Sequence, residues 1–138
     1  MFADGGSRGN PGPAAGGAVL FAADGTPLAE IGEYLGIATN NVAEWRAVLA
    51  GLAKARELGV EDLAVRLDSE LVVRQLTGVY RVKHADLIPL ATKARVLLRT
   101  FRSIDIRHVP RKENAAADAV VNQVLDAAAA RAQAGLPN

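Results

Sequence analysis

Residues 3–13, ADGGSRGNPGP, place one carboxylate, Asp4, at the edge of a glycine-rich hairpin. Asp4 is the first of four acids spaced along the chain. The others end three short motifs: TNNVAE at Glu44, LAVRLD at Asp68 and ENAAAD at Asp118. Four carboxylates from separate elements would repel one another if they converged, so convergence would require divalent cations to neutralise them. This spacing gives the hypothesis of a metal-binding carboxylate cluster.

Hydrophobic patterning outward from this stretch predicts an α/β domain. Apolar runs at 18–22 and 27–35, separated by an Asp-Gly turn, predict two strands of a hairpin, and the residues before Gly5 add a third antiparallel strand. Period-3.6 and period-2 patterns then predict further helices and strands. These are helices at 42–58, 69–76, from Asp86 through Leu98 and from Asn114 onward, with strands at 63–67 and 104–108. The order βββαβαβα indicates a mixed five-stranded sheet flanked by helices.

Length and composition limit the classes of protein to consider. The chain has 138 residues and no Cys, which fits one domain and excludes disulfide or thiolate metal sites. We expect the domain to span 1–126, with 127–138 as a helix end and tail. No apolar run is long enough to cross a membrane, and the N-terminus lacks a signal peptide pattern. We therefore expect a cytoplasmic monomer with no membrane contact.

The distribution of charge is more informative than its net value of +1. Residues 1–70 carry 5 Lys/Arg and 10 Asp/Glu, whereas residues 71–138 carry 11 and 5. Between Arg74 and Lys112, 10 basic residues meet only two acids. Such a segment is either a solvated helix face or a surface for a phosphate backbone beside an acidic metal cluster.

Each motif also has a simpler structural interpretation. Asp4 fits a turn before glycines, and Glu44 fits the N3 position of a capping box whose N-cap is Asn41. Asp68, at the end of a buried strand, should be ion-paired, metal-bound or the N-cap of the next helix. Asp118 lies in a first helical turn, which favours any acid. His108 is either structural or a proton shuttle, because a histidine titrates near neutral pH.

Three nucleotide-binding or acyl-transfer motifs are excluded for the glycine-rich stretch. Residues 5–9 match the letters of the G-x-S-x-G nucleophile elbow, but Asn10–Pro13 cannot form the helix that must follow the serine. The stretch also fits neither a P-loop nor a G-x-G-x-x-G fingerprint.

Taken together, DGGSRGNPGP, TNNVAE, LDSE and HVPRKENAAAD resemble type 1 ribonuclease H in its compact bacterial and archaeal form. The motifs occur in the family's order over nearly the whole chain. The resemblance implies a ribonuclease H-like fold and an endonuclease that cleaves the RNA strand of RNA–DNA hybrids, leaving 5′-phosphates. It also implies two Mg²⁺ ions per site, with Mn²⁺ as a substitute. The family's four metal-binding catalytic acids correspond to Asp4, Glu44, Asp68 and Asp118.

The resemblance assigns further roles. His108 matches a mobile histidine that aids proton transfer or product release. Four residues match positions that contact RNA 2′-hydroxyls and bases, and Thr39 matches a contact to a DNA phosphate. The four RNA-contact positions are Gly9, Asn10, Asn40 and Asn41.

The sequence departs from the family at three places and leaves two alternatives open. Only three residues precede Asp4, Glu70 is acidic where Gln or Lys is usual, and the loop 78–85 lacks a long basic protrusion. We therefore expect a loosely held Asp4 and modest, salt-sensitive affinity for substrate. The alternatives are a non-catalytic hybrid-binding module and a related nuclease that prefers double-stranded RNA or a junction.

Overall fold

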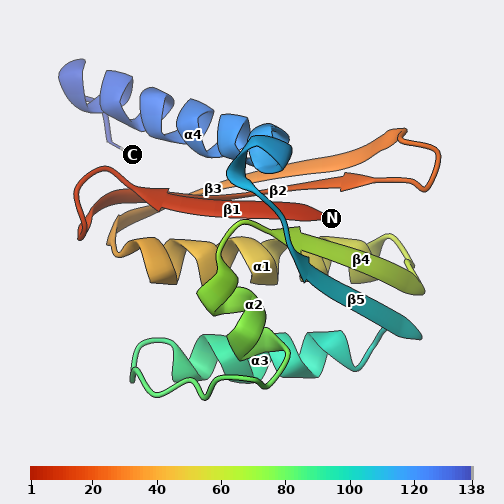
Figure 1. The fold of residues 1–138 in the computed structure, drawn as a ribbon. Helices are drawn as coiled ribbons and strands as arrows, with labels where there is room; N and C mark the ends of the chain where they lie inside the picture. The colour runs from red at the N-terminus through yellow and green to blue at the C-terminus, as the bar shows by residue number, and fades with distance from the viewer. Residues whose placement is uncertain (138) are drawn as a thin grey trace.

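A computed structural model describes residues 1–137 as a five-stranded sheet between helical layers (Figure 1). The predicted βββαβαβα order is confirmed, and the region between the fourth and fifth strands holds two helices, as the sequence also predicted. In chain order the elements are β1 (Phe2–Ser7), β2 (Gly12–Phe21), β3 (Pro27–Ala38), α1 (Asn40–Glu57), β4 (Asp62–Leu67), α2 (Glu70–Leu76), α3 (Ile88–Leu98), β5 (Ser103–His108), the 3-10 helix η1 (Arg111–Asn114) and α4 (Ala115–Gln133).

The sheet is mixed, with strand order β3-β2-β1-β4-β5. β1, β2 and β3 are antiparallel neighbours, whereas β4 pairs parallel with β1 on one side and with β5 on the other. The carboxyl ends of β1, β4 and β5 therefore lie at the same edge of the sheet. In α/β sheets this edge is the usual place for a ligand.

Helices cover both faces of the sheet. α4 lies on one face and α1 on the other, with α3 packed beyond α1 (Figure 1). The larger core, between the sheet and α1, is centred on side chains such as Trp45, Leu52 and Val65, which are at most 1% exposed. A smaller cluster beneath α4 includes Val121 and Leu125. Burial of these aliphatic groups is the main stabilising contribution to the domain.

Two glycines allow the helices to approach the sheet closely. A Cβ atom on Gly5 would lie 2.2 Å from the Ala43 carbonyl carbon and 2.3 Å from the Glu44 nitrogen. On the other face, a Cβ on Gly17 would lie 3.0 Å from the Ala117 carbonyl oxygen. The first turns of α1 and α4 are thereby brought against β1 and β2. Gly5 thus serves helix packing.

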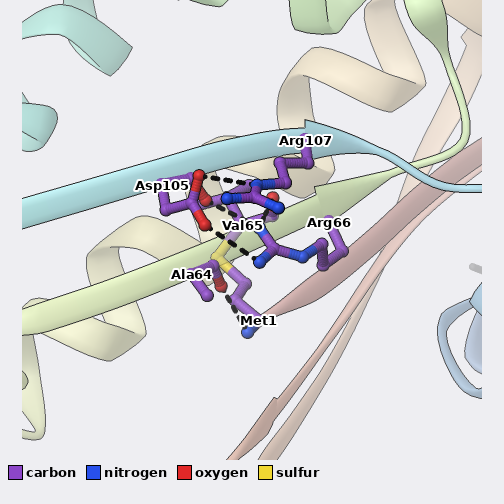
Figure 2. Close-up of polar contacts among 6 residues, drawn as sticks. All are labelled: Met1, Ala64, Val65, Arg66, Asp105 and Arg107. Carbon is purple, nitrogen blue, oxygen red and sulfur yellow. Dashed lines mark hydrogen bonds and ion pairs between the residues drawn. The ribbon is translucent and has the colours of Figure 1, made fainter.

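The start of β1 is anchored in spite of its short length. The Met1 ammonium donates a hydrogen bond of 2.8 Å to the Ala64 carbonyl, and the Met1 carbonyl accepts one of 2.8 Å from the Arg66 amide (Figure 2). The Met1 side chain is buried against Gly51. These contacts contradict the expectation that Asp4 is loosely held, because β1 is fixed to β4 immediately before it.

Two helix starts differ from the sequence prediction. α1 is capped by Thr39, whose hydroxyl accepts a hydrogen bond of 3.2 Å from the Val42 amide. The capping box predicted from Asn41 to Glu44 is therefore wrong. α3 begins at Ile88 instead of Asp86, with Pro89 in its first turn, where a fixed φ is tolerated.

The final helix begins one residue later than predicted and ends within the region expected to hold its end and the tail. The 3-10 turn η1 precedes it, so α4 starts at Ala115 rather than at Asn114. It continues to Gln133, and Ala128 is still buried. Of the tail expected at 127–138, Asn138 lies outside the described residues. Among residues 1–137, none of the helices is both long and apolar enough to cross a membrane.

Candidate active site

Asp4 and Asp68 come from adjacent parallel strands at the carboxyl edge of the sheet. Ala3 and Leu67 are paired in register, so the residue after each of them lies at the same level. Asp68 directly follows β4 and does not cap α2, because Ser69 is the N-cap and accepts from the Val72 amide at 3.3 Å. The structure therefore removes one of the simpler interpretations of Asp68.

Glu44 and Asp118 reach this edge from helices on opposite faces of the sheet. Glu44 lies in the second turn of α1, above the close contact at Gly5. Asp118 lies in the first turn of α4. The start of α4 is fixed by the buried Asn114, whose Nδ2 donates to the Ala3 carbonyl at 2.9 Å. Asn114 belongs to the ENAAAD motif, but nothing in the sequence indicates this contact.

All four predicted acids line one cleft of about 420 Å³. The cleft therefore unites residues from β1, α1, α4 and the end of β4. Its wall also carries polar and basic side chains that have no role in the sequence prediction: Ser7, Arg8, Arg111 and Asn122. Asn122 donates from Nδ2 to Oδ2 of Asp118 at 3.3 Å, one helical turn away. The i, i+4 spacing on α4 was the signal that could have identified it.

Burial and, to a smaller extent, mutual repulsion disfavour the charged forms of two acids in the cleft. Burial, the neighbouring Asp68 and a hydrogen bond with Asp118 raise the pKa of Asp4 to about 8. Burial raises the pKa of Glu44 to about 7, with a hydrogen bond from Ser69 opposing the rise and Asp68 adding to it. Burial thus disfavours the charged form of both groups more than their hydrogen bonds favour it.

The donor set of the cleft fits hard divalent cations. Within residues 1–137, no group of three or more His, Cys, Asp or Glu side chains is arranged so that it could hold a metal ion. The four acids nevertheless face one cleft and offer only oxygen donors, which Mg²⁺ and Mn²⁺ prefer. Cations would also relieve the repulsion that raises the pKa of Asp4 and Glu44.

His108 lies beside the cleft and is not part of its lining. It is the last residue of β5, paired in register with Leu67, the residue before Asp68. Its side chain is exposed. His108 also lies close enough to Glu70 to contribute to a lowered pKa of that carboxyl, whose main cause is its hydrogen bond with Arg74. Sequence analysis therefore placed His108 at the correct edge.

The acidic residue Glu70 is balanced locally. Its Oε1 accepts from Nε and Nη2 of Arg74 at 3.0 and 2.7 Å. The Arg74 guanidinium also lies 5.3 Å from the centre of the Tyr80 ring. Repulsion between Glu70 and a phosphate backbone is consequently weaker than the sequence alone suggests.

The predicted substrate-binding residues form a second group beside the cleft. A pocket of about 500 Å³ is lined by Asn10, Thr39, Asn40 and Asn41, together with His84 and Leu87. The Asn40 side chain accepts from the Ser7 amide at 2.8 Å, and the Asn40 amide donates to the Asn10 side chain at 3.1 Å. Asn40 also lines the acidic cleft, so the two hollows are contiguous.

Gly9 has a different part in this arrangement. Its φ of +88° allows the β1–β2 loop to turn. A side chain at this position would be strained. The Ser7 hydroxyl donates to the Gly9 carbonyl and so ties the loop together.

Comparisons with known proteins find similar sequences over most of the chain. A family model described as reverse transcriptase-like matches residues 2–124. A Mycobacterium tuberculosis protein named bifunctional protein Rv2228c is 52% identical over 96% of this chain and 36% of its own length. Ribonuclease HI of Halobacterium salinarum is 48% identical over 91% of this chain and 63% of its own. The chain thus spans about a third of the mycobacterial relative and less than two thirds of the halobacterial one.

Solved structures show the same similarity. The N-terminal RNase H domain of the mycobacterial protein has a TM-score of 0.90 and covers 94% of both chains. LC11-RNase H1, solved in complex with an RNA/DNA hybrid, is 39% identical with a TM-score of 0.87, covering 92% of this chain and 96% of the other.

Proposed function

The chain belongs to the type 1 ribonuclease H family, and we propose that it is a metal-dependent endoribonuclease that hydrolyses the RNA strand of RNA–DNA hybrids. The observation that carries this proposal is the single cleft lined by Asp4, Glu44, Asp68 and Asp118. A non-catalytic binding module would have no use for four converging acids, two of which have strongly raised pKa values.

The four acids would hold two divalent cations, Mg²⁺ or in its place Mn²⁺, when substrate is bound. When bound, such cations supply Lewis acidity that lowers the pKa of water and stabilises the leaving 3′ oxygen. Burial raises the pKa of Asp4 most, and Asp68 and Asp118 both add to the rise. Asp4 therefore faces both of these acids, which suits a ligand that the two ions would share. Asp118 and the pair of Glu44 with Asp68 would complete one ion site each.

His108 would accept a proton near the site or assist product departure. Its exposed side chain at the end of β5 allows it to move toward the cleft. An imidazole exchanges protons near neutral pH, as this role requires.

The neutral polar pocket would distinguish RNA from DNA. Amide groups of Asn10, Asn40 and Asn41 can donate to 2′-hydroxyls and base edges, and the Gly9 turn holds the loop beside them. The Thr39 hydroxyl accepts from the Val42 amide, which leaves its own proton to donate to a DNA phosphate.

We propose that the protein acts as a cytoplasmic monomer.

One assay tests the proposal and its alternatives. A labelled hybrid, double-stranded RNA and an RNA–DNA junction are incubated with Mg²⁺, Mn²⁺ or chelator. We expect Mg²⁺- and Mn²⁺-dependent cleavage of the hybrid with 5′-phosphate products, and no cleavage in chelator. Binding without cleavage would support the non-catalytic module, and faster cleavage of double-stranded RNA or the junction would support the alternative nuclease. Cleavage in chelator would contradict the metal mechanism.

A further inference from the structure

The acidic cleft contains a cation that the four-acid motif does not explain. Arg8 lies in the loop between β1 and β2 and lines the same cleft as the acids. Its Nη2 lies 2.6 Å from Oδ1 of Asp126 on α4. The two side chains are 43% and 70% exposed. An ion pair with this exposure contributes little to stability, so a need for stability does not account for Arg8.

The backbone at Arg8 is fixed by the surrounding loop. The Arg8 amide donates to the Pro13 carbonyl at 2.8 Å, and the preceding Ser7 amide donates to the Asn40 side chain at 2.8 Å. A Cβ on Gly12 would lie 2.2 Å from the Arg8 carbonyl oxygen. Because Gly12 permits this close approach, the loop presents Arg8 from a defined position.

Helix α4 relates Arg8 to the catalytic acids. Asp118, Asn122 and Asp126 recur at i, i+4 and i+8, so they lie along one side of the helix. Eight residues of α-helix rise about 12 Å, which matches about three nucleotides at roughly 3.4 Å each. Arg8 therefore lies near one end of the cleft wall formed by α4, whose other end carries Asp118.

We propose that Arg8 binds a backbone phosphate of the substrate about three nucleotides from the cleaved bond, and that Asp126 is a positioning residue that holds its guanidinium against the cleft wall. This inference rests on the proposed function. A guanidinium carries five N–H donors in a planar fork that suits a phosphate, and the contact with Asp126 uses one terminal nitrogen. Arg8 also offsets the repulsion between phosphates and the four acids.

The experiment measures hybrid binding without turnover. Variants are made in an Asp68→Asn background with Mg²⁺, and the Kd of labelled hybrids of two sequences is measured by fluorescence anisotropy between about 50 and 200 mM salt. Arg8→Ala is compared with Arg8→Lys, with Asp126→Ala and with Arg56→Ala, an exposed arginine at the far end of α1. Cleavage kinetics in the otherwise wild-type protein separate kcat from KM.

We expect Arg8→Ala to raise Kd about tenfold for both sequences and to reduce the slope of log Kd against log salt by about 0.7 to 0.9. Arg8→Lys retains the slope with a smaller loss of affinity. In the cleavage assay the effect falls on KM. The effect of Arg8→Ala becomes smaller in the Asp126→Ala background, because the two residues act together.

Three results would overturn parts of this inference. A Kd and salt slope of Arg8→Ala equal to those of Arg56→Ala would contradict the phosphate contact, whatever the change in melting temperature. An undiminished effect of Arg8→Ala without Asp126 would contradict the positioning role. Failure of the parent Asp68→Asn protein to bind hybrid, together with no cleavage by the wild type, would instead contradict the proposed function.

Discussion

The acids of the cleft and the acids on the outer strand pair β4–β5 have opposite electrostatic environments. On this strand pair, Asp105 accepts hydrogen bonds from Arg107 and Arg66, which hold its pKa below the usual range (Figure 2). In the cleft, burial and like charges raise the pKa of Asp4 to about 8. Arg8 and Arg111 also line the cleft, but neither lowers the pKa of Asp4. Acids left unneutralised inside a cleft are what a site for external cations requires.

The largest effect should follow loss of one cleft acid. Asp68→Asn keeps the size of the side chain and removes a charge that a cation would need, so we expect cleavage of a hybrid in Mg²⁺ to fall by about a thousandfold. Circular dichroism should show an unchanged fold. Activity equal to wild type would remove Asp68 from the site.

The next largest effect should come from breaking the close contact between β1 and α1. Gly5→Ala places a methyl group against the backbone of Ala43 and Glu44, and we expect a loss of about 3 kcal/mol in urea unfolding. Gly6→Ala is the matched control, because its new Cβ would lie 3.6 Å from a Val121 methyl, an ordinary contact. Equal losses in the two variants would contradict the packing role of Gly5.

A smaller effect concerns pH and stability without metal. The folded pKa of Asp4 is about 8, against 3.8 for the unfolded chain, so the folded state binds the extra proton and loses stability as pH rises from about 4 to 8. Asp4→Asn should therefore raise the melting temperature in chelator by a few degrees at pH 8 to 9 and have little effect near pH 4. A drop in melting temperature at pH 8 to 9 would refute the unfavourable burial of this charge.

The smallest effect should come from the strand pair β4–β5, away from the cleft. Asp62, the first residue of β4, accepts hydrogen bonds from Arg102 and Ser103, which lower its pKa. Its stabilising contribution is present above the unfolded pKa and is lost as pH falls through the folded one. Asp62→Asn should thus lower the melting temperature slightly at pH 7 and leave hybrid cleavage unchanged. A rise in melting temperature would show that the two regions do not differ as described.

Much of the fold and the positions of the acids could be predicted from sequence, because both depend on local pattern. Alternating and helical periods identified the strands and helices, and strand ends located Asp68 and His108 at one edge. The cap of α1 was misplaced because Thr39, Asn40 and Asn41 are all suitable N-cap residues and only their backbone geometry decides among them.

The rest depends on contacts between residues distant in sequence. The Arg8–Asp126 pair joins positions 118 residues apart, and Asn114 reaches Ala3 across 111. The close approach at Gly5 likewise requires knowledge of which helix packs on β1. No local period encodes such contacts, so the wall of the cleft was visible only in the structure.

The most direct test of the account is a titration of the wild-type protein and Asp4→Asn with Mn²⁺ by isothermal calorimetry near pH 8. Since the unneutralised acids of the cleft are the proposed cation site, the wild type should bind Mn²⁺, and Asp4→Asn should bind it at least about tenfold more weakly. Asp62→Asn should bind it as the wild type does. Equal binding by the wild type and Asp4→Asn, or none by the wild type, would contradict the account.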